Sequence, residues 1–154
     1  MSVSTHIMRA SMALMLIRAA EASVLPHTPE QHRLNFLHAC QRGNLARVHQ
    51  RLMGTYETNA QVLDAGLAVA SGRGHVHVMQ YLLGTGATDV ELALYSAAVH
   101  DSVDACKFMT SKDREVPATD LQHALLGATQ HGSLSTELHL TIQIAHPGLR
   151  ELTD

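Results

Sequence analysis

The sequence is poor in aromatic residues. Only 3% of its 154 residues are aromatic, with no Trp, two Phe and three Tyr, whereas 45% are hydrophobic. The scarcity of large rings excludes a core built around aromatic clusters, and the hydrophobic content excludes an intrinsically disordered chain. We therefore expect one domain whose core consists of Leu, Ala, Val and Met, side chains that suit closely packed helices.

The chain also lacks an excess of one charge, a set of cysteines and a long apolar run. Its net charge of −3 and scattered Lys and Arg residues give no basic stripe for nucleic acid. Two cysteines, Cys40 and Cys106, are too few for a secreted disulfide scaffold and indicate buried thiols in a reducing compartment. The apolar run 10–17 ends at Arg18 and is too short to span a membrane. We expect a cytoplasmic protein that does not insert into membranes.

Motifs for catalysis or cofactor binding are missing as well. The G-x-G stretches in 72–77 and 84–89 complete no nucleotide-binding motif, and the sequence has neither H-E-x-x-H nor C-x-x-C. The twelve His residues are interpreted as surface and turn residues. A Cys–His nucleophile is conceivable, but both cysteines fall at apolar core positions, where a thiol is unreactive. We predict no catalytic residue, no cofactor and no metal, and therefore a protein that is not an enzyme.

The N-terminal segment 1–23 has two interpretations. Spaced methionines favour an amphipathic helix that packs on the end of the domain. The lack of acidic residues before Glu21, together with several Ser and two Arg, also fits a mitochondrial presequence. Pro26 and Pro29 then place a linker at 24–33.

The rest of the chain has an internal repeat. Its anchors are Gly43, Gly74, Asp101 and Gly132, spaced by 31, 27 and 31 residues. Small residues come three or four positions before each anchor, and an apolar residue comes two positions after it. We expect each anchor to form a left-handed turn between two antiparallel helices. A single pair cannot bury both its faces, so the pairs must stack. The alternation in 138–145 would also fit a strand, although the repeat favours a helix there.

These residues resemble the ankyrin-repeat family, whose units read approximately T-P-L-H-x-A-A-x-x-G-H-x-x-V-V-x-x-L-L-x-x-G-A. The stretch "GHVHVMQYLLGTGA" at 74–87 matches the second half of that unit, and the resemblance extends over about residues 33–143. No repeat has the T-P-L-H start, so we expect degenerate repeats with reduced hairpin fingers. The resemblance implies an all-α solenoid of about four stacked helix pairs with an extra N-terminal helix. The repeat domain would cover 34–146 and a C-terminal tail 147–154, and a related helical-hairpin stack remains the structural alternative.

The resemblance also implies a function. Ankyrin-like stacks bind other proteins through a concave face and its fingers, so we expect a protein–protein interaction module whose partner the sequence does not identify. A structural subunit of a larger, perhaps organellar, complex and a microbial effector or inhibitor that imitates host ankyrin proteins are the alternatives. With them, a mitochondrial location or delivery into a host cell stays open, as does the oligomeric state. Equivalent repeat positions, together with the finger regions, give these candidate partner-binding residues: Gln41, Arg42, Tyr56, Arg73, His100, Lys112, Arg114, Gln130 and His131.

Overall fold

The structure is a computed structural model that describes residues 28–54, 59–111 and 113–147. The chain divides into two compact units, Met1–Gln31 and His32–Asp154. Nearly all described residues belong to the second unit. The segment 1–23, Tyr56, Lys112 and most of the tail lie outside the described residues.

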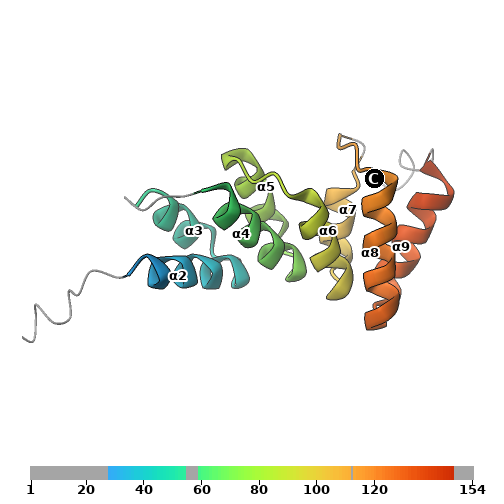
Figure 1. Cartoon of the computed structure of the whole chain (residues 1–154), viewed down its shortest axis with the longest axis horizontal. Helices are drawn as coiled ribbons and strands as arrows, with labels where there is room; N and C mark the ends of the chain where they lie inside the picture. The colour runs from blue at the N-terminus through green and yellow to red at the C-terminus, as the bar shows by residue number, and fades with distance from the viewer. Residues whose placement is uncertain (1–27, 55–58, 112, 148–154) are drawn as a thin grey trace, which may run out of the picture. The chain divides into compact units, whose positions relative to one another are not determined.

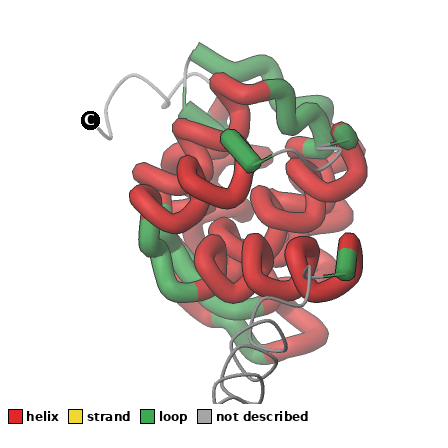
Figure 2. Tube along the Cα trace, turned by 90° about the vertical axis from the view of Figure 1, so that its left-hand side faces the viewer, coloured by secondary structure: helices red, strands yellow, loops and turns green. Residues whose placement is uncertain are grey.

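The described residues form α-helices and no strand (Figure 2). The all-α prediction is confirmed, and the stretch 138–145 is part of a helix. Figure 1 shows the helices following one another in chain order. They are α2 (Pro29–Gln41), α3 (Leu45–Leu52), α4 (Ala60–Gly72), α5 (Val76–Thr85), α6 (Val90–Val99), α7 (Val103–Met109), α8 (Ala118–His131) and α9 (Leu134–Ala145).

Helix α2 begins at Pro29, inside the stretch 24–33 that the sequence suggests as a linker. Proline is compatible with the first position of a helix, because its fixed φ is already helical and its missing N–H would have no partner there. The hydroxyl of Thr28 accepts a hydrogen bond from the Gln31 N–H at 3.2 Å, as an N-cap does. Pro29 therefore starts this helix.

The helices pack in two rows. The even-numbered helices make the first row. Helix α6 lies between α4 and α8, and the ring of Phe36 on α2 lies against Gly66 on α4. The odd-numbered helices make the second row, because α5 contacts both α3 and α7, and α7 contacts α9. Each even helix from α4 onward also packs against the odd helix that follows it. Successive helix pairs from α4 onward therefore contact each other in both rows.

The four turns inside the helix pairs are built alike. Their left-handed residues are Gly43, Gly74, Asp101 and Gly132, with φ of 66°, 72°, 55° and 69°. In every case the next N–H donates to the carbonyl five positions earlier, at 2.9–3.0 Å. This bond is typical of the Schellman motif that ends many helices. The predicted left-handed turn is confirmed at all four anchors.

Side chains also connect each turn to the preceding one. The donor is always the residue that follows the left-handed position, and the acceptor is the carbonyl oxygen two positions before the earlier left-handed residue. The three bonds are His75 Nε2–H to Gln41 (3.0 Å), Ser102 Oγ–H to Gly72 (2.7 Å) and Ser133 Oγ–H to Val99 (3.0 Å). The turns therefore form a hydrogen-bonded ladder, and His75 is a structural member of it.

Asp101 adds a second connection, because its carboxylate caps the helix of the next repeat. The Thr136 N–H, in the first turn of α9, donates to Asp101 Oδ1 at 2.9 Å. The N-cap residue Ser133 makes no side-chain cap bond, because its hydroxyl donates to the Val99 carbonyl in the preceding turn. The hydrogen bond from Thr136 is the main cause that lowers the pKa of Asp101 below its ordinary value.

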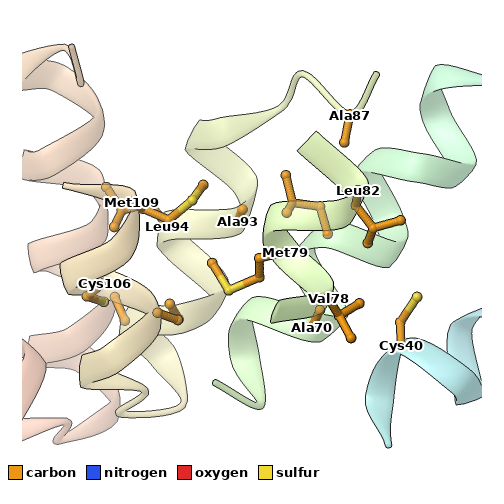
Figure 3. Packing of buried hydrophobic residues seen from close by; sticks show 14 of the residues in the cluster. Cys40, Ala70, Val78, Met79, Leu82, Ala87, Ala93, Leu94, Cys106 and Met109 are labelled. Carbon is orange, nitrogen blue, oxygen red and sulfur yellow. The ribbon is translucent and has the colours of Figure 1, made fainter. Parts of the chain in front are cut away.

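The core is built from small and aliphatic side chains, as the composition predicts. The buried side chains labelled in Figure 3 extend through successive helices, from Cys40 to Met109. Phe36 is the one aromatic side chain in the buried cluster of the described residues. Small residues at the helix contacts, among them Ala70, Ala97 and Ala128, let neighbouring helices approach closely.

Candidate functional site

The even-numbered helices carry large apolar side chains on their solvent side. Leu34 on α2, Leu92 on α6 and Leu126 on α8 are 46%, 44% and 57% exposed. The register of the repeat relates Leu34 and Leu92, which each lie nine positions before a left-handed turn residue, whereas Leu126 lies six positions before Gly132. Side chains of this kind gather at sites where another molecule binds. We call this surface the even-helix face, consisting of Leu34, Gln41, Leu92, Tyr95, His123, Leu126 and Gln130.

Between α6 and α8 the even-helix face is hollowed into an open groove of about 420 Å³. Helix α6 contributes an apolar wall with Leu92 and Tyr95, and α8 contributes Leu126. The polar lining residues are Asp89, Glu91, His123 and Gln130. The groove thus has an apolar lining from Leu92, Tyr95 and Leu126, together with two carboxylates.

Tyr95 owes its position to a glycine on the neighbouring helix. A Cβ atom placed on Gly127 would lie 2.6 Å from the Cε2 atom of Tyr95, which no real side chain tolerates. The absence of a side chain at Gly127 therefore lets the tyrosine ring lie against the α8 backbone. The ring is still 37% exposed, so one part of it packs against the protein and the other faces the groove.

The carboxylates of the groove are held in place by their own contacts. Asp89 caps α6, because its Oδ1 atom accepts from the Leu92 N–H at 2.9 Å. Asp64 on α4 accepts from the Asp89 N–H at 3.0 Å and so fixes the loop that carries the cap. Glu91 Oε1 lies 2.9 Å from His123 Nδ1 across the groove, with both side chains more than half exposed. The helix N-terminus and the histidine thus orient two carboxylates without removing them from solvent.

Four of the predicted partner-binding residues occupy one edge of the fold. They come directly before the left-handed residues, at the ends of the even-numbered helices, and all are exposed: Arg42, Arg73, His100 and His131. The repeat places them at equivalent positions, and the turn ladder joins neighbouring turns. His100 Nδ1–H donates to the Ser96 carbonyl at 2.9 Å, which fixes its ring. This edge carries two arginines, whereas the groove lining has two carboxylates and no Lys or Arg.

The other predicted residues are dispersed. Gln41 is exposed at the end of α2, and Gln130 lines the groove. The Arg114 guanidinium lies 4.7 Å from the centre of the Phe108 ring, in a cation–π contact away from both the edge and the groove lining. Tyr56 and Lys112 lie outside the described residues.

The thiols are not available for chemistry in the folded protein. Cys40 and Cys106 are both fully buried. Burial raises the pKa of each thiol to about 12, and the nearby Asp101 charge contributes to the rise at Cys106. Neither thiol therefore forms an appreciable amount of thiolate near neutral pH.

No three His, Cys, Asp or Glu side chains within 28–54, 59–111 and 113–147 meet in a way that could hold a metal ion. In the same ranges, no helix has the length and apolar content needed to cross a bilayer.

Sequence reasoning missed most of the groove. Of the lining residues only Gln130 is among the partner-binding residues predicted from the sequence, and Leu92, Tyr95, His123 and Leu126 are not. A usable signal was present in α6, whose sequence "VELALYSAAV" is apolar on nearly every side. A helix that is apolar all round needs a partner on all its faces, but Leu92 and part of Tyr95 on α6 stay exposed in the described structure.

No protein-family model, curated protein or solved structure matches the chain.

Proposed function

We propose that the protein is a non-enzymatic protein–protein interaction module with an ankyrin-like arrangement of repeats, and that its partner binds the even-helix face. The observation that carries the proposal is the exposure of Leu92, Tyr95 and Leu126 around one groove of a stacked helical fold. Tyrosine is enriched among the residues that contribute most to binding energy at protein interfaces, and exposed apolar patches mark sites where another molecule binds.

The repeat register supports the ankyrin-like arrangement. Four equivalent Schellman turns and three equivalent side-chain bonds recur at the spacing read from the sequence. Stacked repeats of this kind present one continuous surface made of equivalent positions. We expect the partner to contact equivalent positions of neighbouring repeats along this surface.

Affinity purification with a matched pair of variants tests the proposal. The double variant Leu92→Asp with Leu126→Asp adds two negative charges to the even-helix face. The control, Gln50→Asp with Gln80→Asp, adds the same charge to exposed positions of α3 and α5. We expect proteins that copurify with the wild type to be lost from the first variant and retained by the control. Equal recovery with both variants would rule out this face.

A second candidate function, a subunit of a larger assembly, is favoured by α9. This helix exposes Leu134, Leu138 and Ile142 at 74%, 64% and 38%, and their spacing of four places them on one side. At the corresponding positions of α5 the last two are replaced by Gln80 and Gly84. Mass measurement under native conditions separates the two functions, because an obligate subunit would not persist as a stable monomer when purified alone.

A further inference from the structure

The groove between α6 and α8 has a marked charge bias. Its lining includes two carboxylates, Asp89 and Glu91, and no Lys or Arg. Asp89 is anchored by the cap bond to the Leu92 N–H, and Asp64 holds the backbone beside it. Acidic groups of fixed position next to an apolar surface favour a ligand that is cationic and apolar at once.

The contact of Glu91 with His123 leaves the carboxylate available. Both side chains are more than half exposed, and only Oε1 of Glu91 is in the contact. An exposed pair of this kind contributes little to stability, so an arriving cation can compete with the histidine. A guanidinium has a further advantage, because it can bind both carboxylate oxygens at once.

We infer that the groove binds a segment of the partner protein in which an Arg or Lys stands next to a bulky apolar residue. The cation pairs with Glu91 beside Asp89, while the apolar side chain packs on Tyr95 and Leu126. An acidic segment would meet uncompensated repulsion at the same place. This inference rests on the proposed function, since it names the chemistry of the partner for that face.

The test uses a phage-displayed library of random peptides selected on the purified full-length protein. We expect the enriched peptides to share a basic residue beside a bulky apolar one. Their affinity should fall about tenfold or more for Glu91→Lys and for Leu126→Asp, and should stay unchanged for Gln80→Lys on α5. Circular dichroism checks that each variant keeps its helical content.

A charge swap makes the test stringent. A selected peptide remade with Glu in place of its basic residue should bind the Glu91→Lys variant better than it binds the wild type. Affinity of the original peptide should also fall as salt is raised, because the contact is solvent-exposed.

Several results would overturn the inference. The inference is wrong if the enriched peptides lack basic residues or if the library yields no binder. It is also wrong if the peptides bind the Glu91→Lys variant as tightly as the wild type. The proposed function would survive any of these if cellular proteins are still lost from the Leu92→Asp, Leu126→Asp variant. It fails separately if that variant and its Gln50→Asp, Gln80→Asp control recover the same proteins.

Discussion

Asp101 allows the linkage between repeats to be measured. It occupies a left-handed turn with φ of 55°, where the other three turns have glycine, and its carboxylate accepts the Thr136 N–H of the next repeat. Replacing Asp101 by Ala removes this acceptor and leaves a helical N–H of α9 without its cap. Loss of a cap costs about 1 kcal/mol, and loss of a negative charge at a helix N-terminus costs about 0.5 kcal/mol more.

Backbone conformation supplies the second part of the prediction. Glycine adopts the left-handed region without the cost of about 1 kcal/mol that alanine bears there. We therefore expect Asp101→Ala to lower the free energy of unfolding by about 2 kcal/mol and Asp101→Gly by about 1 kcal/mol less than that. Asp101→Asn keeps an oxygen acceptor, and its loss should be below about 1 kcal/mol. Urea unfolding followed by circular dichroism at pH 7 measures all three.

The pKa of Asp101 gives a pH dependence with a defined sign. Because the folded state lowers this pKa, the ionised carboxylate stabilises the fold above the ordinary pKa of an aspartate. That contribution is lost as the pH falls through the lower pKa of the folded state. The difference in stability between wild type and Asp101→Asn should therefore shrink below about pH 4. Asp113→Asn, a change at an exposed carboxylate outside the helices, is the control and should match the wild type throughout.

Equal stability of the Ala and Gly variants would refute the reasoning about the turn. An Asp101→Ala variant within about 0.5 kcal/mol of the wild type would refute the cap. Amide hydrogen exchange locates the effect: in Asp101→Ala it should quicken in α9 more than in α4, because the lost bond is made to α9.

Further predictions concern packing and buried polar groups. Gly127→Ala should destabilise the protein by about 1–3 kcal/mol in urea unfolding, since the added Cβ would meet the Tyr95 ring at 2.6 Å; Gly84→Ala, in helix α5 with nothing within 4 Å, should stabilise it by about 0.5–1 kcal/mol. The Ser71 hydroxyl is buried with no hydrogen-bond partner among the described residues, so Ser71→Ala should leave stability unchanged or raise it by about 1 kcal/mol. Ser102→Ala, which breaks a ladder bond, should lower stability by about 1 kcal/mol, and the opposite order of the two serine variants would contradict the ladder. The two buried thiols should resist iodoacetamide at pH 8 until urea unfolds the chain; rapid labelling of the folded protein would contradict their burial.

The sequence predicted those parts of the fold that depend on local conformation. Gly43, Gly74 and Gly132 were identifiable because glycine tolerates the left-handed turn, and Asp101 because it falls in the same register. The contacts between repeats could not be predicted from local conformation. Whether the Asp101 carboxylate reaches Thr136 depends on how two helix pairs stack, which residue spacing does not specify.

The candidate site was also predictable only in part. The turn residues Arg73 and His100 could be aligned from the repeat alone, and the structure places both at exposed helix ends. The groove instead requires that Tyr95 lie against Gly127 and that Glu91 reach His123 on the next helix. Both are contacts between different repeats, and both follow from side-chain directions that become known only when α6 and α8 are placed side by side.

Site-specific photocrosslinking in cells of the source organism asks whether a partner protein binds the even-helix face. A benzophenone amino acid is placed at Leu126 on the even-helix face and, in a matched experiment, at the exposed Gln80 on α5. We expect a crosslinked adduct of defined mass from position 126 and none from position 80. Adducts of equal yield from both positions, or an adduct from position 80 alone, would contradict it.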